Sequence, residues 1–216
     1  MQVKEVKIDT TIESKPVYNF FKRLFDIVSA MVALILLSPI FLGVAIAVKL
    51  DSKGAVFFGH KRLGKNGNFI KVYKFRTMYE NSKELFERFT PEQKKEFEIN
   101  FKLDDDPRIT KVGNFLRKSS LDELPQLVNI IKGNMAVVGP RPIVEKELEK
   151  YGEFAGKLLS VKPGLTGNWQ ANGRSDTTYD ERVQMDMDYI NKRSFGLDIK
   201  IIFQTVFSVL KGKGAV

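Results

Sequence analysis

Two adjacent acids, Asp122 and Glu123, lie in the segment "RKSSLDELPQLVNIIKG", residues 117–133. Ser120 and Glu123 form the pattern S-x-x-E ahead of an apolar run, which is typical of a capping box at a helix N-terminus. Pro125 argues against this interpretation, because its missing N–H would fall at the fifth helical position. A helix that begins at Pro125 would leave both acids just outside it, so a helix cap and a catalytic pair both remain open.

In either case the two carboxylates stand near a helix N-terminus, where free N–H groups attract phosphate. Arg117 and Lys118 lie one turn upstream. A carboxylate can act as a nucleophile and form an acyl phosphate. A second acid can bind Mg²⁺ or transfer a proton. The segment therefore indicates phosphoryl transfer.

The composition limits which chemistry is available. The chain has 216 residues, enough for one compact domain, and its net charge of +9 favours nucleic acid, an anionic membrane surface or a phosphate-bearing substrate. It has no Cys and a single His, His60, so disulfides, thiolate catalysis and multi-His metal clusters are excluded. His60 is expected on the surface of a hairpin. No helix-turn-helix pattern or aromatic-basic stripe supports a nucleic-acid-binding protein.

Residues 27–48 form an apolar run without a charge, and about 20 such residues can span a bilayer. Ser38-Pro39 interrupts the run near its centre, and each half, about 18 Å long, is too short to cross alone. Basic residues, which stay on the cytoplasmic side, flank both ends: Lys22, Arg23, Lys49 and Lys53. A helix-break-helix hairpin that returns to the same leaflet fits these features, with the Ser38 hydroxyl as one partner for the exposed backbone. A kinked spanning helix is the alternative.

The other segments predict a mainly helical α+β fold. Residues 1–19 are polar and expected to be flexible, residues 20–50 form the membrane hairpin, and residues 51–216 form the catalytic domain. Residues 55–78 predict a β-hairpin and residues 80–102 two helices, the second beginning at Thr90-Pro91. "VGPRPI" and "KPGLTG" predict ordered loops. The C-terminal segment "LDIKIIFQTVFSVLKGKG" predicts an amphipathic helix, at the membrane interface or packed in the core.

The chain resembles the bacterial sugar transferase family, the monotopic phosphoglycosyl transferases, from about Phe20 to its C-terminus. The motifs that carry the resemblance are "FKRLFDIVSAMVALILLSPI", "VYKFRTM", "DDPRITKVGNFLRKSSLDELPQLVNIIKG", "VVGPRP", "KPGLTGNWQANGRS" and "LDIKIIFQTV". The resemblance implies a re-entrant helix broken at Ser38-Pro39, a small cytoplasmic α/β domain and interfacial helices. It also implies transfer of a sugar 1-phosphate from a UDP-sugar to undecaprenyl phosphate at the bacterial inner membrane.

The resemblance further implies roles for individual residues. Asp122 would be the nucleophile, and Glu123 would assist through Mg²⁺ or by steering a proton, with the metal against both acids. The candidate substrate- and phosphate-binding residues are Arg117, Arg141, Gln170, Asn172, Arg174, Lys22 and Arg23. Lys22 and Arg23 would either bind the prenyl phosphate or set the angle at which the hairpin enters the bilayer.

The sequence departs from the family pattern at Asn134 and Ala136, where Asp and Ser are common. The region around "WQANGRSD" resembles hexose-type members, which favours UDP-galactose or UDP-glucose, with an N-acetylated sugar as the alternative.

The chain is expected to correspond to the minimal form of the family or to the catalytic part of a larger member. A non-catalytic membrane scaffold is a rival interpretation, although a scaffold would need neither acid. Phospholipid is the expected surface partner, no nucleic acid is expected, and a homodimer stays open.

Overall fold

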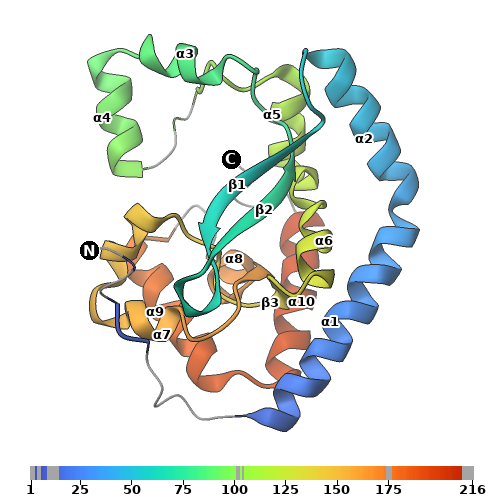
Figure 1. Cartoon of the computed structure of the whole chain (residues 1–216), viewed down its shortest axis with the longest axis vertical. Coiled ribbons are helices and arrows are strands. Elements are labelled where there is room, and N and C mark those ends of the chain that lie inside the picture. Colours follow the sequence, from blue (N-terminus) through green and yellow to red (C-terminus); the bar gives the residue numbers. More distant parts are fainter. Residues whose placement is uncertain are drawn as a thin grey trace.

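A computed structural model describes residues 3, 6–8, 15–100, 103, 105–173 and 177–210, without the side chains of 98–100 and 210. Most of the N-terminal segment expected to be flexible, together with Arg174 and the lysines after Leu210, lies outside these residues. The described chain is mainly helical, with two two-stranded sheets (Figure 1). This agrees with the predicted α+β class.

The apolar run forms two helices, α1 (Pro16–Leu36) and α2 (Ser38–Asp51), which meet at Leu37 with a bend of 64°. Pro39 lies in the first turn of α2, where its missing N–H is tolerated. The Ser38 hydroxyl donates to the carbonyl of Ile35 at 2.8 Å, as expected for a backbone group freed at the break. No single described helix is long and apolar enough to cross a membrane, whereas the bent pair meets that criterion by length and composition.

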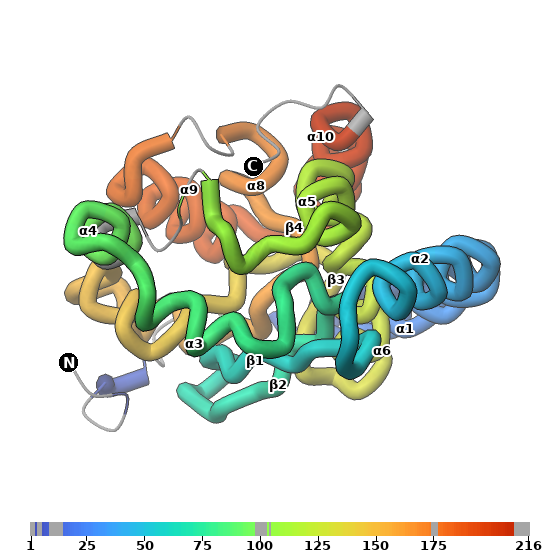
Figure 2. The backbone as a smooth tube through the Cα atoms, turned by 90° about the horizontal axis from the view of Figure 1, so that it is seen from above, coloured from blue at the N-terminus to red at the C-terminus, as the bar shows by residue number. Residues whose placement is uncertain are grey.

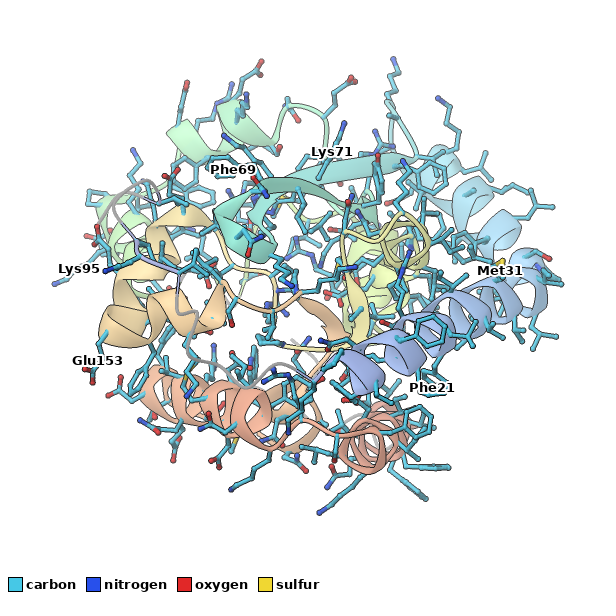
Figure 3. All side chains as sticks on the ribbon, turned by 60° about the horizontal axis from the view of Figure 1, so that its bottom comes forward. Phe21, Met31, Phe69, Lys71, Lys95 and Glu153 are labelled. Carbon is cyan, nitrogen blue, oxygen red and sulfur yellow. The ribbon has the colours of Figure 1, made fainter. Side chains whose placement is uncertain are left out.

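The two helices form an outer arm that extends away from the rest of the molecule (Figure 2). Large apolar side chains are exposed along it, and Phe21 and Met31 of α1 are among them (Figure 3). The inner side of α1 packs through Ala30 against Leu127 and Ile130 of α6 (Gln126–Ile131). Arg76 holds the end of α2 by donating to the carbonyls of Val48, Ser52 and Lys53. The arm is therefore fixed to the domain at both helices.

The predicted hairpin consists of β1 (Phe57–Leu63) and β2 (Phe69–Phe75), antiparallel, with Phe57 opposite Phe75. A short 3₁₀ turn, η2 (Lys65–Gly67), joins the strands and contains Asn66 in the left-handed conformation. The predicted helical pair follows as α3 (Ser82–Glu87) and α4 (Pro91–Asn100). Thr90 and Gln93 cap α4 reciprocally through side-chain bonds to each other's backbone N–H.

One expected loop contains a strand. In "KPGLTG", β4 (Gly164–Thr166) pairs in parallel with β3 (Ala136–Val138), and Ala136 lies opposite Gly164. A side chain at Gly164 would collide with the backbone of Gly139, so the approach of the two segments requires glycine. Three-residue strands rich in Gly carry too little alternation to be recognised in a sequence.

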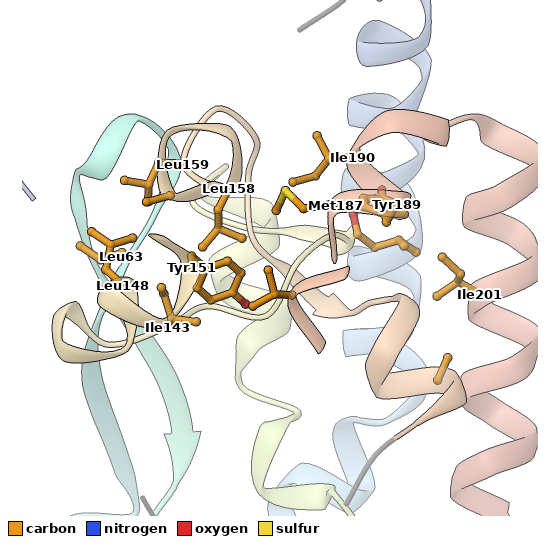
Figure 4. Close-up of a cluster of buried hydrophobic side chains, with 14 residues drawn as sticks. Leu63, Ile143, Leu148, Tyr151, Leu158, Leu159, Met187, Tyr189, Ile190 and Ile201 are labelled. Carbon is orange, nitrogen blue, oxygen red and sulfur yellow. Dashed lines mark hydrogen bonds between the residues drawn. The ribbon is translucent and has the colours of Figure 1, made fainter. Parts of the chain in front are cut away.

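The largest buried cluster packs Leu63 of β1 and Val138 of β3 against the helices of the C-terminal half (Figure 4). It includes residues of η4 (Glu145–Phe154), α7 (Ala155–Leu158) and α9 (Tyr179–Lys192). The helix α10 (Phe195–Leu210) contributes the fully buried Ile201, whereas Phe203 and Phe207 are each 62% exposed. One side of the C-terminal helix therefore packs in the core, as one of the two expectations had it, and the other side presents an apolar surface.

Candidate active site

The backbone around the acid pair excludes the capping box. Ser120 adopts a left-handed conformation (φ 57°) after α5 (Lys111–Lys118), and its side chain makes no capping hydrogen bond. Asp122 and Glu123 lie in a separate 3₁₀ turn, η3 (Leu121–Glu123), and α6 begins only after Pro125. A left-handed non-glycine residue costs about 1 kcal/mol and is often found at functional sites. Both carboxylates are thus free of the helix cap that the pattern S-x-x-E predicted.

Lys74 of β2 joins the two carboxylates. Its Nζ atom lies 3.2 Å from Asp122 Oδ2 and 2.6 Å from Glu123 Oε1. The side chain of Asp122 is only 8% exposed, compared with 22% for Glu123 and 25% for Lys74. Sequence reasoning did not single out Lys74, although it lies in the quoted motif "VYKFRTM". The hairpin therefore supplies the cation that forms ion pairs with both acids.

The environment separates the pKa values of the two acids. Burial raises the pKa of Asp122, and the charge of Glu123 raises it further, against the opposing effect of Lys74. Burial would also raise the pKa of Glu123, but Lys74 and Arg141 together outweigh it and lower that pKa. The surroundings thus favour the ionised form of Glu123 and disfavour that of Asp122, for which Lys74 is the main opposing charge.

Two of the predicted phosphate-binding arginines lie beside this pair. Arg117 donates from Nε to Thr77 Oγ1 at 3.0 Å, and its charge interacts with that of Asp122. Arg141 interacts electrostatically with Glu123 and lies 5.8 Å from the ring of Trp169. Within the described part of the chain, its guanidinium forms no hydrogen bond or ion pair. Its donors remain available for an anionic ligand.

The polar residues of α8 (Asn168–Asn172) have local partners. Gln170 donates to the carbonyl of Leu165 at 3.3 Å, while its Oε1 is buried without a partner. Asn172 donates to Asn168 O at 2.9 Å and reaches Gln204 of α10 at 3.5 Å. Arg174 lies outside the described residues. The link from α8 to the acid pair is instead Trp169, through Arg141.

Lys22 and Arg23 have partners inside the protein. Lys22 forms an ion pair with Asp198 at 2.8 Å, and Arg23 donates to the carbonyls of Ile130 and Ile131 at the end of α6. Asp26 also accepts from the N–H of Val137 in β3 at 3.0 Å. Of the two expected roles, these contacts favour fixing the angle of α1 over binding a phosphate.

The acid pair suits a magnesium ion shared with a substrate. Among the described residues no group of three or more His, Cys, Asp or Glu could hold a metal. Mg²⁺ commonly needs only one or two carboxylates together with substrate phosphates and water. Asp122 and Glu123 already direct oxygens at one cation, the ammonium of Lys74. The donor set thus fits Mg²⁺ in the presence of a phosphate ligand rather than a metal site made of protein alone.

The buried Asp122, the half-buried Glu123, the lysine that bridges them and Arg141 thus form a charged cluster whose groups suit phosphate chemistry. The family model for bacterial sugar transferases matches residues 17–212, so the chain belongs to the bacterial sugar transferase family. This confirms the resemblance seen in the motifs.

Named relatives cover most of the chain. The exopolysaccharide production protein ExoY of Rhizobium meliloti is 48% identical over 204 residues, which are 93% of this chain and 90% of the relative. The undecaprenyl-phosphate galactose phosphotransferase of Salmonella typhimurium is 46% identical, over 91% of this chain and 42% of the relative. The UDP-glucose:undecaprenyl-phosphate glucose-1-phosphate transferase of Escherichia coli is 43% identical, over 92% of this chain and 42% of the relative.

Proposed function

We propose that this protein transfers a hexose 1-phosphate from a UDP-sugar to undecaprenyl phosphate, giving undecaprenyl-diphosphate-sugar and UMP. The names of the Salmonella and Escherichia relatives support this reaction class. The observation that carries it is the buried carboxylate of Asp122, held by Lys74 beside an ionised Glu123 and the unpaired Arg141. A nucleophile surrounded by cations suits attack on a diphosphate.

In the first step, a carboxylate oxygen of Asp122 attacks the β-phosphorus of the UDP-sugar. A new P–O bond to Asp122 forms as the bond to the α-phosphate oxygen breaks, and UMP leaves with that electron pair. Lys74 favours the ionised form of Asp122, because its charge opposes the increase in the carboxyl pKa that burial causes. Arg141 and Arg117 would bind the diphosphate oxygens, which a planar guanidinium can contact in pairs.

In the second step, a phosphate oxygen of undecaprenyl phosphate attacks the same phosphorus. The acyl phosphate bond breaks, Asp122 regains its carboxylate, and Glu123 accepts the proton of the acceptor if it carries one. Mg²⁺, held by Asp122 and Glu123, would neutralise phosphate charge when bound. This sequence is a ping-pong reaction with a covalent intermediate.

The acceptor places the reaction at a lipid surface. We infer that α1 and α2 form a re-entrant hairpin in the bacterial inner membrane, with the catalytic domain on its cytoplasmic face. The bend at Leu37, the exposed apolar side chains and the basic residues at both ends support this topology. The exposed side of α10, with Phe203 and Phe207, would contact phospholipid at the interface.

The names of the relatives do not decide between galactose and glucose, because the Salmonella relative is named for galactose and the Escherichia relative for glucose. An N-acetylated UDP-sugar is the alternative donor. The name of ExoY supports a role in starting an exopolysaccharide. A non-catalytic scaffold would not need two carboxylates converging on one partly buried lysine, because a charge cluster removed from water costs stability.

The test is the intact mass of the protein after incubation with Mg²⁺ and a panel of UDP-sugars, without acceptor. We expect the mass of one sugar phosphate to be added, together with release of UMP, and neither in Asp122→Asn. The sugar that gives the adduct identifies the donor. Release of UMP only after undecaprenyl phosphate is added would retain the enzyme but refute the covalent step. Folded protein that forms neither product from any UDP-sugar would refute the reaction.

A further inference from the structure

The single histidine lies on the hairpin face that carries Lys74. In the register of β1 and β2, Phe58 lies opposite Lys74 and His60 opposite Val72. Opposed side chains of an antiparallel pair share a face of the sheet, and alternate residues of a strand return to that face. The rings of Phe58 and His60 lie 5.9 Å apart. His60 lies on the predicted hairpin, but it is half-buried on the face that carries Lys74 rather than fully exposed.

Arg62 sets the hydrogen-bonding state of this imidazole. Its Nη2 atom lies 3.2 Å from His60 Nδ1. A guanidinium can only donate, so Nδ1 accepts and the proton of the neutral ring resides on Nε2. Burial and the charges of Arg62, Lys74 and Arg141 lower the pKa of His60 to about 4, which keeps the ring neutral at pH 7. Nε2–H has no partner among the described residues.

A second set of contacts holds Arg62 in place. Its Nη1 atom donates to Glu147 Oε1 at 3.0 Å, and Tyr179 donates to Glu147 Oε2 at 3.4 Å. Glu147 Oε1 also accepts from the N–H of Val144 at 3.1 Å. The imidazole is thus oriented by η4 and α9, far along the chain from the hairpin. A ring fixed in this way presents its free N–H in one direction.

The surroundings indicate what this N–H could bind. Lys74 and Arg141 lie within electrostatic reach of His60 and already supply cationic donors for the phosphate oxygens. The uncharged N–H of His60 is a further donor beside them, available to an oxygen of the same ligand that carries no charge. We propose that His60 Nε2–H donates a hydrogen bond to a neutral oxygen of the UDP-sugar, either a hydroxyl of the hexose or a carbonyl of the uracil, and so contributes to donor recognition. This inference rests on the proposed function.

The test compares His60→Phe, which removes the donor, with His60→Gln, which keeps an N–H donor. We expect His60→Phe to lower kcat/KM for the UDP-sugar about 10-fold, the effect of one hydrogen bond to a neutral group. His60→Gln should recover most of this loss. Lys61→Gln is the matched control, because Lys61 is the next residue of β1, is exposed on the opposite face and should retain wild-type kinetics.

Inhibition by UMP separates the two acceptor oxygens, because UMP contains the uracil but not the hexose. Weaker inhibition of His60→Phe by UMP would place the bond on the nucleotide and exclude the hexose, and unchanged inhibition would place it on the hexose. Wild-type kcat/KM in His60→Phe, or equal losses in both His60 variants, would overturn the inference alone. Wild-type protein that forms no UMP from any UDP-sugar would refute the proposed function, and this inference with it.

Discussion

Asp122 and Asp198 are both buried carboxylates beside a lysine, but their hydrogen bonds differ. Asp198 accepts from Tyr189 at 2.8 Å through Oδ1, and from Tyr18 at 2.9 Å and Lys22 at 2.8 Å through Oδ2. Asp122 accepts only from Lys74, at 3.2 Å, and its Oδ1 has no partner within the described chain. Both oxygens of Asp198 are thus hydrogen-bonded within the protein, whereas Oδ1 of Asp122 can accept a hydrogen bond from a ligand.

The same difference separates the cations of the two regions. Lys22 and Arg23 bind groups of the protein and connect α1 to α10 and α6. Arg141 has no such bond to any residue that the structure describes, although it lies within electrostatic reach of Glu123. Buried polar groups are normally satisfied by hydrogen bonds. Charged groups with hydrogen-bonding positions that no described residue occupies therefore distinguish the candidate active site from the junction between the helical arm and the domain.

The largest expected effect follows from replacing the nucleophile. Asp122→Asn keeps the size of the side chain but removes its charge, and we expect at least about a 1,000-fold loss of UMP formation. Thermal stability should be retained, because burial raises the pKa of Asp122, so the folded state does not favour the charge that the substitution removes. UMP release and thermal unfolding in detergent measure both. Loss of activity that only parallels unfolding would contradict the comparison.

The junction should respond in the opposite way. Asp198→Ala leaves the ammonium of Lys22, whose side chain is 14% exposed, without its partner. Breaking such a pair destabilises a protein by about 3 kcal/mol. We expect a lower midpoint of unfolding in detergent, with UMP formation per folded molecule changed far less than in Asp122→Asn.

The control for this stability effect is the exposed pair Lys192–Asp188, whose side chains are 72% and 58% exposed. Asp188→Ala should change stability by less than about 0.5 kcal/mol. Equal destabilisation by Asp198→Ala and Asp188→Ala would show that the Asp198 contacts do not hold the arm to the domain.

Sequence patterns were sufficient where the cause is local. The uncharged run and Ser38-Pro39 predicted two helices and a break, and the break lies one residue earlier, at Leu37. Alternating apolar residues around Gly64 predicted the hairpin, and its two strands are confirmed. The pattern S-x-x-E predicted a cap that is not formed, because Ser120 turns left-handed and Pro125 delays the helix.

The rest depends on contacts between distant segments. Lys74 meets the acids across 48 and 49 residues, and Lys22 meets Asp198 across 176 residues. Nothing near Lys22 in the sequence distinguishes a cation that binds a lipid phosphate from one that binds an internal carboxylate. The motif "VYKFRTM" marked the right strand, but only the packing of the hairpin against η3 identifies Lys74 as the partner of both acids.

Removing the bridging lysine should change both the rate and its pH dependence. Lys74→Met removes the charge that lowers the pKa of Asp122, so burial and Glu123 raise that pKa further. Asp122 must be ionised to attack, so activity falls as the pH falls through its pKa. The acidic limb of kcat/KM should therefore move to higher pH. We expect about a 100-fold loss at pH 7, part of which is recovered at higher pH.

Lys71 provides the control for this prediction. It lies on the same strand as Lys74 but on the opposite face of the hairpin, and its side chain is exposed (Figure 3). Lys71→Met should leave both the rate and the pH profile unchanged. A loss in Lys74→Met that is identical at every pH would mean that Lys74 binds substrate phosphate without controlling the charge of Asp122.

The smallest expected effect sharpens the assignment of the phosphate-binding cation. Arg141 and Arg182 both lie over Trp169, at 5.8 and 4.8 Å, but Arg182 also donates to Thr177 at 3.3 Å. Arg141→Lys keeps the charge and loses the planar fork, so KM for the UDP-sugar should rise about 10-fold. Arg182→Lys should change it less, because Arg182 is already bonded within the fold. If Arg182→Lys instead gives the larger increase, the diphosphate binds on the α9 side of Trp169, and the unpaired state of Arg141 does not mark the donor site.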